Sequence, residues 1–122
     1  MGDFRQLKVW QRSKDLAVFI YQLTGDGAFA KDFGLKDQLR RAAISIPSNI
    51  AEGDELDTNT QSVRHFYISK GSVAEVLTQT IIAREIGYID TSKFAEIETK
   101  CHVISGMLTR LIQARKGSKI VP

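Results

Sequence analysis

The apolar positions between residues 91 and 115 follow the most regular pattern in the chain. Six of them are separated by three, four, three, four and three residues: Phe94, Ile97, Cys101, Ile104, Leu108 and Leu111. This spacing puts all six side chains on one stripe of a helix, and its heptad character is typical of helices that pack side by side in a bundle. Because Cys101 belongs to the stripe, we expect it to be a small buried side chain and not a nucleophile.

A second helix is predicted over residues 34–53. Its apolar side chains recur at three- and four-residue steps: Leu35, Leu39, Ala42, Ala43, Ile46 and Ile50. Pro47 removes one backbone donor in mid-helix and predicts a bend, which the short polar side chains around it are suited to brace. Gly53 is expected to end this helix. The acidic run at residues 52–57 lacks the ligand spacing of a calcium loop and is expected to be solvated.

Two more helices are predicted, over residues 8–24 and 59–86. After the helix at residues 8–24, the two glycines of residues 25–27 predict a turn. Thr58 and Gln61 have the spacing of a capping box at the start of the third helix. Gly71 lies inside that helix, where glycine costs about 1 kcal/mol relative to alanine, so we expect a close helix–helix approach there.

The chain has no alternating β pattern, and its four predicted helices are joined by short connections. This combination predicts an all-α fold, an antiparallel up-and-down four-helix bundle. The 122 residues are expected to form one domain, with helices at about 8–24, 34–53, 59–86 and 91–115 and a loose tail over residues 117–122.

Composition excludes several classes of protein. Hydrophobic residues make up 43% of the chain and charged residues 25%, as in ordinary globular domains. No apolar run reaches the roughly 18 residues of a membrane span, and no signal peptide begins the sequence. The single cysteine rules out an internal disulfide framework. We therefore expect a cytoplasmic protein with no membrane attachment.

The sequence predicts no active site. His65 and His102 fall on different predicted helices, and no nucleophile is placed beside either one. Glu98 and His102 are four residues apart, whereas di-iron bundles repeat a Glu-x-x-His spacing on two helices. We therefore expect no enzymatic activity, no cofactor and no metal.

The net charge of +3 and the pI near 9.1 permit an acidic partner without requiring one. Five basic residues of the first two helices would form one basic face if those helices were neighbours. These candidate nucleic-acid contacts are Lys8, Arg12, Lys36, Arg40 and Arg41. The alternative is solvated charge scattered over the surface.

Several apolar residues lie off the main stripes of their helices, which suggests self-association. These candidates for an oligomer interface are Ile44, Ile68, Val76, Ile82 and Met107. The alternative is a core stripe wide enough to include them.

Four segments together resemble a known family. They are FRQLKVWQRSKDLAVFIYQLT, FGLKDQLRRAAISIPSNIAEG, FYISKGSVAEVLTQ and GYID, and they span roughly residues 4–112. This ordered set resembles the 23S rRNA intervening-sequence proteins, also called S23-type four-helix-bundle proteins. One departure is the DELDTNTQ segment after Gly53, which is acidic where a positive charge is common in that family.

The resemblance implies an up-and-down four-helix bundle that assembles as a homopentamer and binds RNA or another nucleic acid. Carried over, Arg40 and Arg41 are the expected phosphate contacts, with Lys36 beside them. The function expected from the sequence is thus a non-enzymatic, self-assembling bundle that binds structured RNA through a basic face. The alternative is a protein–protein interaction or scaffold module that binds no nucleic acid.

Overall fold

The computed structural model describes residues 3–56 and 58–117, and this part of the chain is helical without a strand. A short 3₁₀ helix is followed by five α-helices: η1 (Phe4–Gln6), α1 (Lys8–Leu23), α2 (Gly27–Lys31), α3 (Phe33–Glu55), α4 (Asn59–Glu85) and α5 (Thr91–Gly117). Among the described helices, none combines the length and apolar composition that crossing a bilayer requires. The expected loose tail lies outside the described residues, except that Gly117 ends α5.

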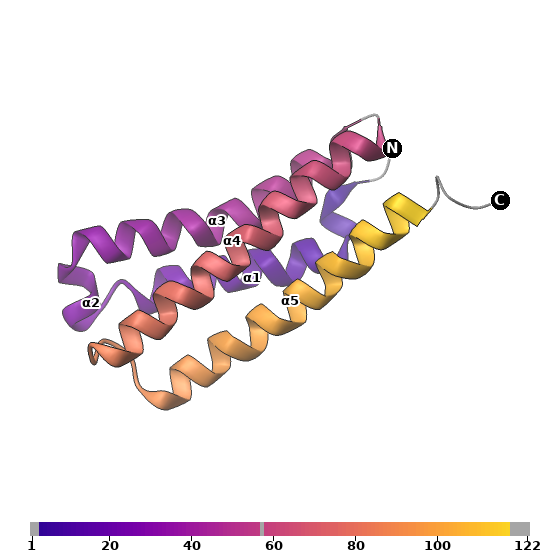
Figure 1. The fold of residues 1–122 in the computed structure, drawn as a ribbon. Helices are drawn as coiled ribbons and strands as arrows, with labels where there is room; N and C mark the ends of the chain where they lie inside the picture. Colours follow the sequence, from indigo (N-terminus) through magenta and orange to yellow (C-terminus); the bar gives the residue numbers. More distant parts are fainter. Residues whose placement is uncertain (1–2, 57, 118–122) are drawn as a thin grey trace.

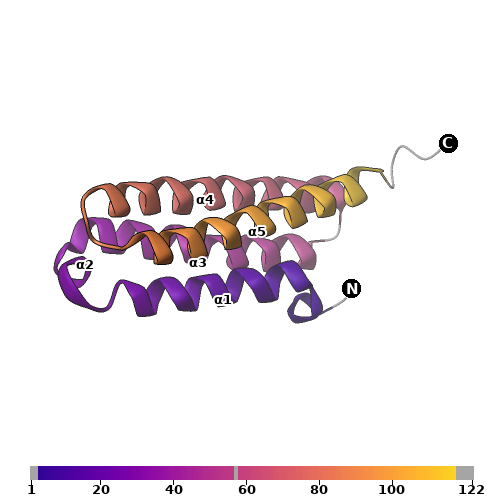
Figure 2. The same ribbon diagram turned by 90° about the horizontal axis from the view of Figure 1, so that it is seen from below.

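The four long helices run alternately up and down, so that both termini lie at one end and α2 lies at the other (Figure 1). Helix α3 packs against α1 and α4, and α5 packs against α4 and, less extensively, against α1 (Figure 2). The helices therefore follow the cyclic order α1, α3, α4, α5. This arrangement confirms the predicted all-α antiparallel four-helix bundle.

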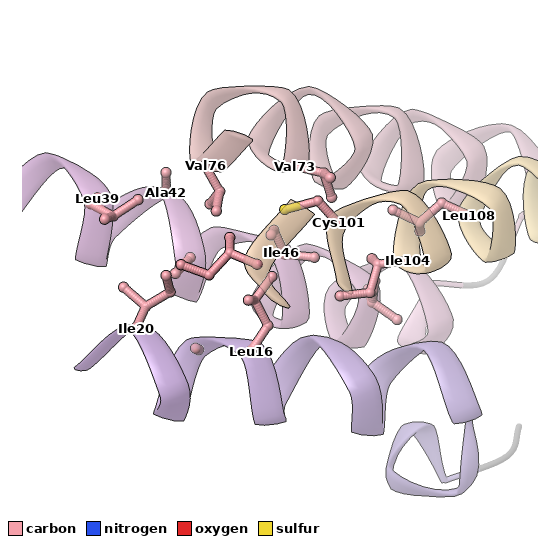
Figure 3. Close-up of a cluster of buried hydrophobic side chains, with 14 of the residues drawn as sticks. Leu16, Ile20, Leu39, Ala42, Ile46, Val73, Val76, Cys101, Ile104 and Leu108 are labelled. Atoms are coloured by element: carbon pink, nitrogen blue, oxygen red, sulfur yellow. The ribbon is translucent and has the colours of Figure 1, made fainter. Parts of the chain in front are cut away.

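Side chains from all four long helices meet in the core, where Leu16 and Ile46 point toward Ile104 and Cys101 (Figure 3). The heptad stripe of α5 is buried through Leu108, but Leu111 is only half-buried and Ile112 takes the next core position. A straight helix has 3.6 residues per turn and drifts by about 20° per heptad against a 3.5-residue repeat. Phe94 and Ile112 are 18 residues apart. At 3.6 residues per turn this is about five full turns, so Ile112 and not Leu111 returns to the side of the helix that Phe94 occupies.

Helix α2 was not predicted, since five residues are too short to give a periodic signal. Gly27 begins it with φ +63°, a conformation that glycine adopts without strain. Phe29 is fully buried, and its ring centroid lies 5.3 Å from that of Tyr88 in the α4–α5 connection. Helix α2 therefore closes the end of the core opposite the termini.

Pro47 is buried inside α3, and polar side chains around it join α3 to α4. Asn49 Nδ2 donates to the backbone oxygen of Ser45 at 3.0 Å. From α4, Ser69 Oγ donates to the backbone oxygen of Ile46 at 2.8 Å, and Ser72 Oγ donates to Ser45 Oγ at 2.9 Å. Two of these three hydrogen bonds therefore link α4 to the turn of α3 that contains the proline.

Gly53 and Gly71 both differ from what the sequence led us to expect. Gly53 does not end α3, which continues to Glu55, but lies buried against α4. A Cβ atom at Gly53 would lie 2.6 Å from Cε1 of Phe66 and 3.1 Å from the backbone oxygen of Ser62. Gly71, by contrast, is exposed and would place a Cβ atom in open space. The expected close approach is therefore at Gly53, and the expectation for Gly71 was wrong.

The acidic run is also not wholly a solvated loop. Asp54 lies in the last turn of α3, and the nitrogen Nη2 of Arg115 in α5 donates to its Oδ1 at 3.0 Å. The Asp54 side chain is only 9% exposed. This ion pair joins the ends of α3 and α5 across 61 residues of sequence, a contact that local spacing does not reveal.

Gly53→Ala is expected to destabilise the protein by about 1–3 kcal/mol, because the buried Phe66 ring and a backbone oxygen would both have to move. Gly71→Ala adds the same methyl group to an exposed helix position and is expected to stabilise the protein by about 0.5–1 kcal/mol. Denaturant unfolding followed by circular dichroism measures both changes. Equal stabilities of the two variants would contradict the close α3–α4 contact.

Candidate nucleic-acid interface

Arg40 joins α3 to the carboxyl-terminal end of α1. Its Nε donates to Thr24 Oγ1 at 2.8 Å and its Nη2 to the backbone oxygen of Tyr21 at 3.0 Å. The guanidinium carbon also lies 4.3 Å from the centroid of the Tyr21 ring. A cation is favourable at a helix carboxyl terminus, where backbone carbonyls lack partners. Arg40 thus has a structural role in the bundle, which the sequence analysis did not anticipate.

The other two basic candidates of α3 differ from each other. Lys36 Nζ donates to the backbone oxygen of Ala30 at 3.0 Å and lies 4.9 Å from the centroid of the Phe33 ring, so it fastens α2 to α3. Arg41 is exposed and makes no hydrogen bond or ion pair with the rest of the described chain. Of the three basic candidates on α3, Arg41 therefore has the charged group that is most available to a phosphate.

Lys8 and Arg12 do not join this group. Helices α1 and α3 are neighbours, which is the condition that the basic face required, but they are antiparallel, and Lys8 lies about 20 Å along α1 from the Tyr21 contact of Arg40. Arg12 faces α5, where it lines a surface cavity of about 350 Å³ with Thr99 and Lys100. The expectation of one basic face formed by all five candidates was therefore wrong.

The structure instead assembles a basic edge between α1 and α5, which consists of Arg12, Phe19, Lys93 and Lys100. The ammonium groups of Lys93 and Lys100 each lie 5.5 Å from the centroid of the Phe19 ring. A second cavity of about 470 Å³ opens beside Phe19 and Lys93. Lys8 precedes Arg12 by four residues, one helical turn along the same face of α1.

Carboxylates are also present along this edge. Asp15 lines the cavity of Arg12 and pairs with Lys14 at 2.8 Å, and Glu96 Oε2 lies 3.9 Å from Lys100 Nζ. Exposed pairs of this kind contribute about 0–1 kcal/mol, so a phosphate can replace Glu96 as the partner of Lys100 at little cost.

Lys93 and Lys100 were missed by the sequence analysis, although a signal was present. Each directly precedes a residue of the α5 stripe, Phe94 and Cys101, and the two lysines are seven residues apart. Heptad spacing therefore places both lysines on the same flank of the stripe. Only the packing of α1 against that flank shows that Arg12 and Phe19 join them.

Among the residues that the structure describes, the titratable groups form no arrangement typical of catalysis. Burial, and then the charge of Glu98, raise the pKa of Cys101 to about 12, so the thiol stays protonated at neutral pH. His102 lines a cavity that has no carboxylate among its described lining residues. His65 Nδ1 lies 3.0 Å from Asn49 Oδ1 and 3.4 Å from Glu52 Oε2, where it bridges α3 and α4. Within residues 3–56 and 58–117, no group of three potential metal ligands is found.

Asp32 holds two parts of the chain together near α2. Its carboxylate accepts from the backbone N–H of Leu35 at 3.1 Å and from the hydroxyl of Tyr88 at 2.9 Å. These hydrogen bonds, first that of Leu35 and then that of Tyr88, lower the pKa of Asp32. Asp32 is thus a helix cap and a link to the α4–α5 connection, which gives it a structural role.

The five apolar candidates for an oligomer interface differ in how far they are exposed. Ile44, Ile68 and Ile82 are 43%, 45% and 46% exposed, respectively. Val76 is fully buried, so its assignment to an outer surface was wrong, and Met107 is half-buried against the core. Helix α4 packs against both α3 and α5, and its buried stripe is therefore wide enough to include Val76.

Comparisons with known proteins match this chain to a sequence family and to solved structures. The sequence profile of a family described as 23S rRNA-intervening sequence protein matches residues 5–110. A crystal structure of a protein of unknown function from the S23 ribosomal protein family, from Bacteroides thetaiotaomicron, superposes with a TM-score of 0.80. The two are 21% identical, and the match covers 86% of this chain and 98% of that chain, which shows a common fold. No curated protein matches the chain.

Arg40 and Arg41 are adjacent in sequence but are expected to respond differently to truncation. Arg40→Ala is expected to destabilise the protein by about 1–3 kcal/mol, because it removes charge-assisted hydrogen bonds to Thr24 and Tyr21. Arg41→Ala is expected to change stability by less than about 0.5 kcal/mol, as for other exposed side chains. Thermal unfolding of both variants measures the difference, and a stable Arg40→Ala protein would contradict the structural role of Arg40.

Proposed function

This chain belongs to the 23S rRNA-intervening sequence protein family, as its motifs led us to expect, and we propose that it is a non-enzymatic helical bundle that self-assembles and binds structured RNA. The observation that carries the proposal is the basic edge, where Arg12, Lys93 and Lys100 gather around Phe19. Three positively charged side chains on two neighbouring helices can bind neighbouring phosphates of a folded RNA.

The proposed contacts recognise the charged phosphates of the RNA backbone and not the base sequence. Lysine and arginine side chains on exposed helix faces reach phosphate oxygens, which fix position without reporting the base. Arg41 is proposed as a separate phosphate contact on α3, since Arg40 and Lys36 hold α1 and α2 in place. Affinity would therefore depend strongly on salt and weakly on sequence.

RNA binding is tested by titrating a labelled RNA hairpin with the protein at two salt concentrations. Lys93→Gln/Lys100→Gln is expected to weaken binding about tenfold or more at low salt. It is also expected to reduce the salt slope, which is the slope of the logarithm of the binding constant against the logarithm of the salt concentration, by roughly 2, one for each phosphate contact. Arg41→Gln is expected to reduce the slope by roughly 1.

Arg64→Gln/Arg110→Gln is the matched control, because it also removes two exposed positive charges, but from positions outside the basic edge. This control is expected to bind the hairpin nearly as wild type does. Wild-type protein that fails to bind at low salt would overturn the RNA proposal.

Self-association is proposed to use the outer apolar side chains of α4. Ile68 and Ile82 are 14 residues apart on one side of α4, and Ile86, the residue directly after the helix, follows Ile82 by four; each of the three is about half exposed. Ile44 adds an exposed apolar side chain on α3. A homopentamer is the assembly that we propose, on the ground of the family resemblance.

Ile68→Asp/Ile82→Asp is expected to convert the assembly to monomers, because each buried interface would receive two unpaired carboxylates. Thr78→Asp places a charge at another exposed position of α4 and serves as the control. Analytical ultracentrifugation gives the mass of each species. A wild-type monomer, or an Ile68→Asp/Ile82→Asp protein of unchanged mass, would contradict this interface.

The exposed isoleucines also support a second candidate function, a scaffold module that docks a protein partner. The two candidates differ in their response to salt. Partner binding that survives high salt and is lost in Ile44→Asp, with the bundle still folded, would favour the scaffold function.

A further inference from the structure

A groove runs along the outer side of α4 and α5, away from the basic edge. It consists of two cavities, of about 440 and 350 Å³, and Tyr67 and Lys70 line both. Each volume is within the range of about 300–1,000 Å³ that is usual for ligand pockets. From Cys101 in one cavity to Lys116 in the other, α5 extends about 22 Å, so the groove can hold an extended ligand.

The groove combines an exposed aromatic ring with positive charge. Tyr67 is 50% exposed and stands where the two cavities meet. The ammonium group of Lys116 lies 5.8 Å from the centroid of its ring. Lys70 lines both cavities, and His102 lines one of them. Gly71 adds no side chain to the wall, which leaves space beside Tyr67.

The charge of this groove differs from that of the basic edge. No carboxylate is among the described lining residues of either groove cavity, whereas Asp15, Asp26 and Asp90 line the cavities of the edge. Glu98 acts on one end of the groove, where its charge adds to the effect of burial in raising the pKa of Cys101. Around Tyr67 the groove therefore favours an anionic ligand with a flat, apolar face.

We propose that the α4–α5 groove binds an unpaired stretch of nucleic acid, with one base stacked on Tyr67 and the flanking phosphates bound by Lys70 and Lys116. Aromatic rings with lysines on either side bind single strands in this way, because every base has a face that stacks. In a duplex the base faces are covered by neighbouring bases, so Tyr67 cannot reach them. The proposal rests on the nucleic-acid binding proposed above and names a second site with a different form of ligand.

The test compares an unstructured eight-nucleotide RNA with the same strand in a duplex, each labelled and titrated with the full chain by fluorescence anisotropy. Tyr67→Ala is expected to weaken single-strand binding about tenfold and to leave duplex binding unchanged. Tyr67→Phe keeps the ring and is expected to bind the single strand within about twofold of wild type.

A second variant tests the charges without altering the ring. Lys70→Gln/Lys116→Gln is expected to weaken single-strand binding and to reduce the salt slope by about 1.4, the contribution of two phosphates on a single strand. Arg64→Gln/Arg110→Gln removes the same charge from residues that line neither cavity and is expected to bind as wild type does. Circular dichroism checks that each variant is folded.

The outcomes separate this proposal from the function proposed above. Single-strand binding that is unchanged in both Tyr67→Ala and Lys70→Gln/Lys116→Gln overturns the groove site, even if the hairpin still binds at Lys93 and Lys100. An equal loss in Tyr67→Phe and Tyr67→Ala overturns the stacking role. An acidic octapeptide that displaces the single strand, together with full binding by Tyr67→Ala, would instead assign the groove to an acidic protein segment. Absence of binding to either RNA overturns both proposals.

Discussion

The close contact between α3 and α4 is the constraint on which the rest of the bundle depends. Phe66 lies against the backbone of α3 only because Gly53 has no Cβ atom. Two serines of this contact are buried, and their hydroxyl groups have partners: Ser62 Oγ donates to the backbone oxygen of Gly53, and Ser69 Oγ to that of Ile46. Buried hydroxyls are tolerated when they are hydrogen-bonded. The contact thus combines close approach with satisfied polar groups around the Pro47 interruption.

Helices α1 and α5 are fixed to this pair partly by cations that lie over aromatic rings. Arg40 reaches from α3 to Tyr21, Arg84 from α4 to Phe94, and Arg115 lies over Phe66 while it pairs with Asp54. Such contacts contribute about 0.5–2 kcal/mol, depending on how far they are desolvated. Several positive charges of this basic chain therefore support the fold, so that not all of its 17 lysine and arginine side chains are free to meet a polyanion.

The sequence was sufficient for the four long helices and their topology, because periodic spacing reports which face of a helix is buried, but not for the five-residue helix α2. It was insufficient wherever a residue's role depends on its partner helix. The burial of Val76 follows from the packing of α4 against both α3 and α5, and the roles of Gly53 and Gly71 follow from where two helices touch. Likewise, the spacing of Lys93 and Lys100 placed them on one face, but not beside Arg12 of α1.

The way the helices are joined also explains where the bundle offers binding surfaces. Between α3 and α4, buried serines and the Gly53 contact fill the interface. On both sides of α5 the packing leaves open cavities, lined by Lys93 and Lys100 toward α1 and by Lys116 toward α4. The α5 stripe buries one narrow face of a long helix, so lysines on its two flanks keep their stems on the bundle and their charged ends in water. A polyanion that approached α5 would therefore meet positive charge on both flanks, with an aromatic ring beside each: Phe19 on one side and Tyr67 on the other.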